Sequence, residues 1–178
     1  MRIIAGRAKG LILKAPPEGT RPMTGRAKES LFSIIGSRLP EAVVLDLYAG
    51  SGSIGLEALS RGATSCVFVE RGNRASKVLA DNVAKVGLGG DIRASTVDSA
   101  LTKLDGPFDL VFVDPPYAED DRTVSGVLSR IEPLLADDGL VVIHRQARST
   151  LVVPEFLTCT DERRYGDAVV TMMERSQT

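Results

Sequence analysis

The tetrapeptide Asp114-Pro115-Pro116-Tyr117 combines residue types that could hold a flat molecule bearing an amino group. It follows an apolar run over residues 110–113, and the strand should end there because proline has no N–H for the β ladder. The carboxylate and a proline carbonyl can accept hydrogen bonds from an exocyclic NH2, while the aromatic ring can stack on the attached base. An ordinary turn uses similar residues, so the tetrapeptide alone leaves both interpretations open.

A second motif lies upstream, where residues 50–55 read GSGSIG and fit the spacing G-x-G-x-x-G. An apolar strand-like run precedes this glycine loop, and a helical pattern over about residues 55–61 follows it. Glycines let the backbone approach a nucleotide closely, and the N–H groups at a helix N-terminus point toward it. Tight strand-to-helix turns also need glycine, so the motif alone is weak evidence for a nucleotide site.

Three acidic residues follow the strand pattern: Asp46 just before the glycine loop, Glu70 after the next apolar run, and Asp98 after the run over residues 92–97. Glu70 has the spacing of an acid that binds a ribose in nucleotide-binding folds. Asp98 could accept a hydrogen bond from an adenine amino group, or it could cap a helix. Asp46 would repel a pyrophosphate but suits a sulfonium or ammonium group, which favours S-adenosylmethionine over a dinucleotide.

We expect these residues at one edge of a sheet, because open α/β sheets bind ligands at the carboxyl ends of their parallel strands. Gly50 and Pro115 should therefore share the rim of one pocket. The candidate catalytic residues are Asp114, Pro115, Pro116 and Tyr117, and the candidate cofactor-binding residues are Asp46, Tyr48, Gly50, Gly52, Glu70, Arg71, Asp98, Ser99 and Asp114. No metal site is expected, since the two cysteines lack the spacing of metal ligands.

The elements that must position these residues alternate between strand and helix patterns, which is typical of an α/β fold with a parallel sheet and helices on both faces. Strands are predicted at 43–48, 65–70, 91–97, 109–114 and 139–145, and helices at about 25–39, 55–61, 73–86 and 122–135. A terminal hairpin is predicted from 156–163 and 168–174, and a short hairpin arm within 3–13. We therefore divide the chain into an N-terminal arm, residues 1–20, and a body, residues 21–178.

Charge is distributed unevenly along the chain. Residues 1–40 carry eight lysines or arginines and two acids, a charge of +6, so the remaining residues hold −7 of the total of −1. A basic arm on an acidic body suggests that a polyanion docks there, although a well-solvated surface would have the same composition.

Length and composition indicate a single soluble domain, because 178 residues with 43% apolar side chains can bury a sizeable core. No apolar stretch approaches the roughly 18 residues that a membrane-spanning helix needs, and the N-terminus lacks the apolar region of a secretory signal. Cys66 and Cys159 are expected to be reduced core residues of a cytoplasmic protein, since disulfides are rare in the cytosol.

Together these segments resemble the class I S-adenosylmethionine-dependent methyltransferases and, more closely, the bacterial 16S ribosomal RNA guanine-N2 methyltransferases of the RsmD family. The resemblance covers almost the whole chain and is carried by RIIAGRAKG, RPMTGRAKESLFSIIG, DLYAGSGSIGLEALSRGA, VFVER, DPPY and RRYGD. It implies a Rossmann-like seven-stranded sheet with an antiparallel last strand, S-adenosylmethionine as cofactor, and 16S rRNA of the small ribosomal subunit as partner. The implied reaction is methylation of the exocyclic N2 amine of a guanine, and we expect a monomer.

The resemblance also implies roles for individual residues. Asp46, Gly50 and Gly52 would hold the methionine part of the cofactor, Glu70 its ribose and Asp98 its adenine, while the tetrapeptide 114–117 would hold the target base. The residues expected to bind RNA are Arg2, Arg7, Lys9, Arg21, Thr24 and Arg26.

Two positions depart from the family pattern, which often has aspartate in place of Gly25 and an acid in place of His144. His144 is the only histidine and follows the apolar run over residues 141–143. Because nothing in the sequence pairs it with a nucleophile, we expect a structural role or a place at the rim of the site.

Three other interpretations remain open from the sequence. A DNA adenine-N6 or protein amino methyltransferase could use the same tetrapeptide, although 178 residues leave little room for a DNA-recognition segment. A dinucleotide oxidoreductase would lack a substrate domain. A non-catalytic RNA-binding assembly protein could retain the fold, but the intact acids and tetrapeptide argue against it.

Overall fold

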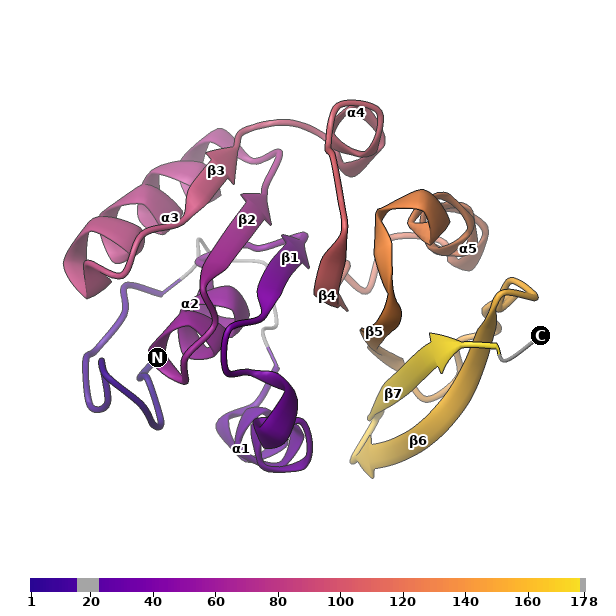
Figure 1. The fold of residues 1–178 in the computed structure, drawn as a ribbon, viewed down its shortest axis with the longest axis horizontal. Helices are drawn as coiled ribbons and strands as arrows, with labels where there is room; N and C mark the ends of the chain where they lie inside the picture. Colours follow the sequence, from indigo (N-terminus) through magenta and orange to yellow (C-terminus); the bar gives the residue numbers. More distant parts are fainter. Residues whose placement is uncertain (16–22, 177–178) are drawn as a thin grey trace.

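The computed structural model describes residues 1–15 and 23–176, which form a seven-stranded sheet with the strand order β3-β2-β1-β4-β5-β7-β6 (Figure 1). The strands are β1 Val43–Leu47, β2 Ser65–Val69, β3 Asp91–Arg93, β4 Phe108–Val113, β5 Leu135–Gln146, β6 Leu157–Tyr165 and β7 Ala168–Arg175. Strands β1 to β5 pair in parallel, whereas β7 runs antiparallel between β5 and β6. The predicted mostly parallel sheet with an antiparallel last strand is confirmed.

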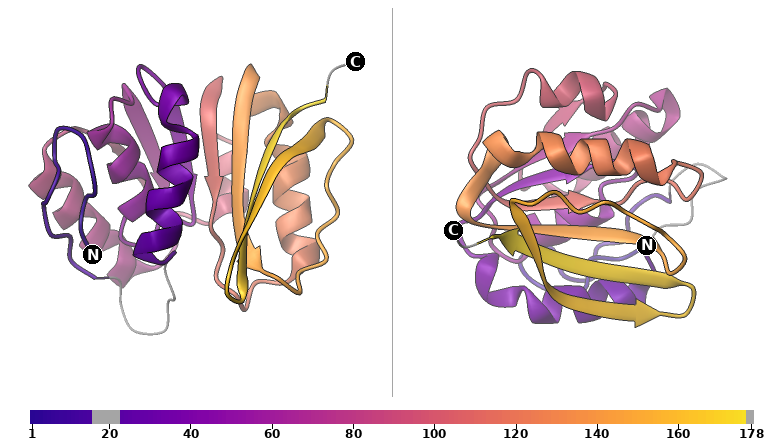
Figure 2. Two further views of the ribbon diagram at one scale, coloured as in Figure 1. Left: turned by 90° about the horizontal axis from the view of Figure 1, so that it is seen from below. Right: turned by 90° about the vertical axis from the view of Figure 1, so that its right-hand side faces the viewer.

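Helices cover both faces of this sheet, as the alternating pattern predicts (Figure 2). One layer holds α1 Gly25–Ile34, α2 Ser53–Ser60 and α3 Asn73–Val86, and the other holds α4 Val97–Leu101 and α5 Asp121–Arg130. The described residues also form the 3-10 helices η1 Gly36–Arg38 and η2 Glu132–Leu134.

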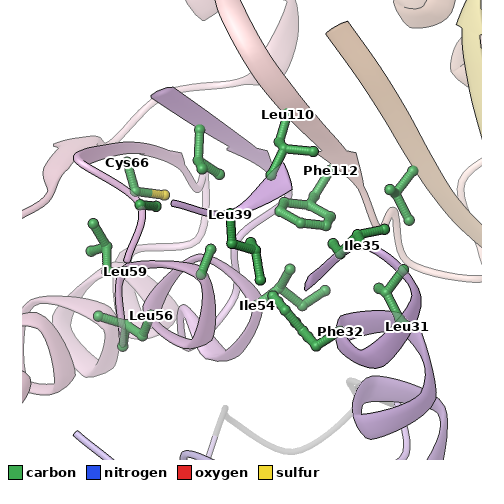
Figure 3. Packing of buried hydrophobic residues seen from close by; sticks show 14 of the residues in the cluster. Leu31, Phe32, Ile35, Leu39, Ile54, Leu56, Leu59, Cys66, Leu110 and Phe112 are labelled. Carbon is green, nitrogen blue, oxygen red and sulfur yellow. The ribbon is translucent and has the colours of Figure 1, made fainter. Parts of the chain in front are cut away.

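Successive residues of the central strands point to opposite faces, so each strand contributes to two separate cores. In β4, Phe112 belongs to the core beneath α1 and α2, whereas Val113 belongs to the core beneath α5. The ring of Phe32 in α1 packs against Phe112 with centroids 6.0 Å apart (Figure 3). Because both faces are covered, these strands read as continuous apolar runs, and their positions were predictable for that reason.

The N-terminal arm lies against α2 and shares the core of the body. Its two halves meet at an antiparallel bridge between Arg2 and Ile12 rather than along two strands. Ile3 is fully buried in the same cluster as α2, and the carboxylate of Glu57 in α2 accepts hydrogen bonds from two backbone N–H groups of the arm at 2.8 and 3.0 Å. The described part of the arm is therefore docked on the body.

Several predicted boundaries are wrong. The first helix ends at Ile34 rather than near residue 39. The third strand ends at Arg93 rather than at 97, because the Thr96 side chain caps α4 and residues 97–101 are helical. The helix expected over 122–135 ends at Arg130, since Pro133 lacks the N–H that a continuing helix would need. Strand β5 consequently begins at Leu135, four residues earlier than predicted.

The two cysteines have different environments. Cys66 in β2 is buried as expected, but Cys159 is exposed on β6, so its predicted place in the core is wrong. The physical reason is that β6 is an edge strand, where residues can face solvent. Both cysteines are free. Within residues 1–15 and 23–176, no helix has the length and apolar character needed to cross a membrane.

Candidate active site

A cavity of about 450 Å³ opens at the carboxyl ends of β1, β2 and β4. Gly50 and Pro115 both line it, so the glycine loop and the tetrapeptide share one pocket as expected. The other predicted site residues that line it are Asp46, Tyr48, Glu70, Arg71, Asp98, Asp114, Pro116 and Tyr117. Gly52 and Ser99 are not among its lining residues.

The glycine loop turns into α2 through left-handed backbone conformations. Tyr48, Gly50 and Gly52 have φ angles of 63°, 56° and 80°, and such a value is uncommon for tyrosine. A Cβ atom added at Gly52 would lie 2.4 Å from Cδ1 of Leu79 in α3. Gly52 is thus required by the turn and by its packing against α3. Burial, with Glu119 nearby, raises the pKa of Tyr48 to about 12, so this phenol keeps its proton.

Asp46 reaches the cavity from within β1 and is almost fully buried. Its Oδ2 accepts a 2.9 Å hydrogen bond from the Gly55 N–H at the start of α2. Burial raises the pKa of Asp46 to about 7, and the carboxylates of Asp114 and Glu70 act in the same direction. Positive charge in the cavity would therefore stabilise the ionised form of Asp46.

Glu70 holds two loops by their backbone. Its Oε2 accepts a hydrogen bond from the Gly50 N–H at 2.9 Å, and its Oε1 accepts one from the Gly72 N–H at 2.6 Å. A carboxylate oxygen can accept more than one hydrogen bond, so Glu70 can fix the glycine loop and still face a ligand in the cavity.

Asp98 lines the cavity, but its local structure differs from the prediction. It lies in the first turn of α4 rather than at the end of a strand, because Thr96 is the residue that caps the helix. Its Oδ1 is 2.5 Å from Nη1 of Arg130 in α5. Ser99 also belongs to the cap, since its N–H donates to the Thr96 hydroxyl at 3.3 Å.

His144 pairs directly with the tetrapeptide, a contact that the sequence did not indicate. Its Nδ1 lies 2.7 Å from Oδ1 of Asp114, and the histidine is only 3% exposed. Its ring also lies beside Tyr117, with centroids 6.1 Å apart. Strands β4 and β5 are adjacent and parallel, which brings these residues together at one sheet edge although 30 positions separate them in sequence.

Arg145, the next residue of β5, holds the other end of the tetrapeptide. Its Nη1 donates to the Pro116 carbonyl at 3.2 Å, and its Nη2 donates to the Glu119 carbonyl at 2.8 Å and to Asp121 at 2.7 Å. The pKa of Asp121 is lowered by hydrogen bonds, first from Ser149 and then from the Thr150 N–H and Arg145. This partner of Arg145 therefore stays charged. The sequence signal for these contacts was a pair of polar residues, His144 and Arg145, directly after the apolar run over residues 140–143.

The residues expected to bind RNA are mostly at the surface. Five of the six are exposed: Arg2, Arg7, Lys9, Thr24 and Arg26. Thr24 also caps α1 by accepting a hydrogen bond from the Ala27 N–H. Arg21 lies outside the described residues.

The count of basic residues overstates the positive charge that faces solvent. Lys28 is buried with its Nζ 3.3 Å from Oε2 of Glu57, and burial lowers the pKa of this lysine despite the carboxylate. Arg38 pairs with Glu174 of β7. Lys28 therefore joins α1 to α2 inside the fold rather than contributing to a basic surface.

The fold and the cavity together define a class: a Rossmann-like methyltransferase fold, with its ligand cavity at the carboxyl edge of the sheet. The chain belongs to the family described as Conserved hypothetical protein 95, whose model matches residues 1–174.

Similar proteins extend over nearly the whole chain. It is 32% identical over 180 residues to Ribosomal RNA small subunit methyltransferase D of Escherichia coli K12, covering 98% of this chain and 90% of that protein. It is 35% identical over 182 residues to YlbH of Bacillus subtilis 168, named as a candidate rRNA methyltransferase, with coverages of 98% and 92%. The solved structure of yhhF, a candidate methyltransferase from Escherichia coli, matches with a TM-score of 0.89 and 31% identity, covering 98% of this chain and 97% of that one.

Proposed function

We propose that this protein transfers a methyl group from S-adenosylmethionine to the exocyclic N2 amine of a guanine in 16S rRNA of the small ribosomal subunit. The observation that carries this proposal is one cavity lined by both the glycine loop, at Gly50, and the amine-binding tetrapeptide, at Pro115 and Tyr117. Methyl transfer needs donor and acceptor in one site, because the reacting atoms must approach to about 3–3.5 Å. The relative named as a ribosomal RNA small subunit methyltransferase supports RNA as the substrate.

The residues around the cavity fit S-adenosylmethionine. Asp46 would face the positively charged methionine part, and Glu70 would accept hydrogen bonds from the ribose hydroxyls. Asp98 would accept one from the adenine amino group through Oδ2, since Arg130 is bonded to Oδ1. Tyr48 and Arg71 line the same cavity and would flank the donor. When bound, S-adenosylmethionine supplies an electrophilic methyl group on a sulfonium.

The tetrapeptide would prepare the amine to attack. The nitrogen lone pair of an exocyclic amine is delocalised into the ring, so the group is a poor nucleophile. Asp114 would accept one N–H and the Pro115 carbonyl the other, because the Pro116 carbonyl is already bonded to Arg145 and to the Glu119 N–H. These two bonds orient the lone pair and stabilise the positive charge that develops on nitrogen.

The proton balance requires no strong base. As the N–C bond forms and the S–C bond breaks, the amine nitrogen becomes cationic and then loses one proton toward the Asp114 side. The hydrogen bond from His144 to Asp114 would keep the carboxylate in the orientation that accepts the amine. Tyr117 would stack on the base, which must leave its helix to reach the site.

The exposed basic residues would contact the rRNA backbone. Arg2, Arg7 and Lys9 on the arm and Arg26 on α1 are exposed and could lie against phosphates, with Thr24 beside them. Because the substrate would be a ribosomal particle or its RNA, we place the enzyme in the cytoplasm. We also propose that it acts as a monomer.

The test uses labelled S-adenosylmethionine with three acceptors: small ribosomal subunits from cells lacking this protein, naked 16S rRNA and duplex DNA. We expect the label as N2-methylguanine in subunit RNA, and the inactive control is Asp114→Ala. Label in DNA adenine would replace this proposal with a DNA methyltransferase. Cofactor binding by calorimetry without transfer to any acceptor would indicate a non-catalytic assembly protein.

A further inference from the structure

A second, smaller cavity shares Tyr117 with the first. Its volume is about 200 Å³, and it lies between the N-terminal end of α1 and the turn that joins β6 to β7. The α1 side contributes Thr24, and the turn side contributes Tyr165 and Asp167. His144 lines this second cavity and is not among the residues that line the first.

The two cavities meet at the tetrapeptide. Tyr117 lines both of them, and the 2.7 Å contact between Asp114 and His144 joins the wall of the first to the wall of the second. A flat group held in the second cavity could therefore place one substituent beside Asp114, where the first cavity begins. This is the arrangement that an acceptor needs when the methyl donor occupies the larger cavity.

We propose that the second cavity receives the target purine and that Asp167 selects guanine by accepting a hydrogen bond from its Watson–Crick edge. This inference rests on the proposed methyl transfer and adds where the acceptor binds and which residue reads it. Aromatic residues suit a flat base, and Tyr117, His144 and Tyr165 all line the second cavity.

Asp167 supplies the selectivity because the edges of guanine and adenine differ beside the amine. Guanine presents a second donor, N1–H, next to its amino group, whereas adenine presents a nitrogen lone pair there. With the amine at Asp114, a neighbouring donor needs its own acceptor, and a lone pair would be repelled by a carboxylate. Asp167 is exposed, and among the described residues its carboxylate has no hydrogen-bond or ion-pair partner, while its backbone carbonyl accepts a hydrogen bond from the Ala147 N–H at 2.8 Å.

The walls of the second cavity are held in place without a ligand. The Tyr165 hydroxyl lies 2.6 Å from the Ser30 hydroxyl, which ties β6 to α1 across the cavity's two sides. Gly166 adopts a left-handed φ of 62° in the turn, so the turn keeps its shape through local backbone geometry. A base entering this site would meet preformed walls.

A binding experiment on the wild-type protein tests the site without relying on turnover. Alanine methyl groups report on each cavity separately, since Ala27 and Ala168 line the second cavity while Ala75 and Ala118 line the first. In a protein labelled with 13C at alanine methyls and saturated with S-adenosylhomocysteine, guanosine monophosphate should shift the Ala27 and Ala168 signals. Adenosine monophosphate should shift them less. Shifts at Ala75 and Ala118 alone, or none at millimolar nucleotide, would overturn the assignment.

Two variants test the site in the reaction. Ala168→Phe should fill the cavity and lower kcat/KM on small subunits by more than about tenfold, with Ala84→Phe on the exposed face of α3 as the matched control. Asp167→Asn should lower kcat/KM by about tenfold through loss of one charged hydrogen bond, with Asp105→Asn, also exposed, as its control. S-adenosylhomocysteine affinity should stay within about twofold of wild type in each case.

The outcomes separate this inference from the function on which it rests. Wild-type kcat/KM in both Ala168→Phe and Asp167→Asn would overturn the second cavity while leaving rRNA methylation intact. An inactive wild-type protein that still shows guanosine monophosphate shifts at Ala27 and Ala168 would overturn the proposed reaction and uphold the binding site.

Discussion

The donor side and the acceptor side of the main cavity are held by different kinds of contact. On the donor side, backbone N–H groups of the glycine loop bond to Glu70 and Asp46, at the ends of adjacent strands. On the acceptor side, the tetrapeptide is held by two side chains of β5, His144 at Asp114 and Arg145 at Pro116. The donor side therefore depends on backbone shape near the motif, and the acceptor side on distant side chains.

This difference decides what a substitution should do. A change within the tetrapeptide or in β5 should reduce transfer while leaving cofactor binding intact, because Gly50 and Gly55 donate their hydrogen bonds to Glu70 and Asp46 rather than to β5. A change in Asp46 should act first on cofactor binding. Three predictions test this separation, and a fourth tests an RNA contact outside the cavity.

The largest effect is expected for Asp114→Ala, which removes the acceptor for the amine. Catalysis should fall by about a thousandfold, the upper range for losing one transition-state hydrogen bond, while S-adenosylmethionine affinity measured by calorimetry stays near normal. Asp114→Asn, which keeps the shape but not the charge, is the matched variant. Full turnover in Asp114→Ala would remove Asp114 from the mechanism, whereas full turnover in Asp114→Asn alone would show that the acceptor oxygen suffices without the charge.

His144→Phe should give the next largest effect, because it keeps an aromatic ring in β5 but removes the bond to Asp114. We expect kcat to fall by up to about 100-fold, the scale of a misplaced reacting group, with little change in KM or in cofactor affinity. His144→Gln retains an N–H donor and should recover part of kcat. If both variants lose cofactor affinity instead, β5 supports the donor side as well and the two sides are not separate.

The same difference explains how much the sequence could predict. Gly50, Glu70 and the tetrapeptide follow the carboxyl ends of apolar runs. Because these runs form parallel strands, their carboxyl ends lie at the same edge of the sheet. Strands β1, β2 and β4 and the apolar part of β5 were predictable because burial on both faces makes them continuous apolar segments, whereas β3 is a three-residue edge strand with two exposed residues. The antiparallel last strand followed from the resemblance and from the hairpin pattern.

The remainder depends on contacts between distant segments, which a single sequence does not reveal. His144 was assigned a structural or rim position because its partner lies 30 residues away. Lys28 was counted in the positive charge of residues 1–40 because its buried partner, Glu57, lies in another helix. Asp98 was placed at a strand end because the Thr96 cap competes with strand propensity in a short segment.

Asp46 should make cofactor binding depend on pH. Its pKa of about 7 in the folded protein lies above its ordinary value of 3.8, so the folded protein holds a proton there that the unfolded chain has released. Stability of the ligand-free protein from this group should therefore fall as pH rises from about 4 to 7, and level off above. A cationic cofactor should favour the ionised form, which makes binding about tenfold weaker at pH 6 than at pH 8.

Calorimetry across this pH range measures the effect, and Asp46→Asn is the control because it keeps the hydrogen-bond acceptor for Gly55 without a titrating group. The variant should bind more weakly at pH 8 and lose the dependence between pH 6 and 8. An unchanged pH profile in Asp46→Asn would assign the dependence to another group and leave the charge of Asp46 without a role on the donor side.

The smallest effect is expected outside both sides of the cavity, at Arg26 on the exposed surface of α1. If this residue contacts a phosphate, Arg26→Ala should weaken RNA binding by a similar factor for every sequence and reduce the salt slope of binding by about 1. Arg122→Ala, exposed on α5 across the sheet, should leave the slope unchanged. Equal slopes in wild type and Arg26→Ala would mean that α1 does not meet the RNA backbone there.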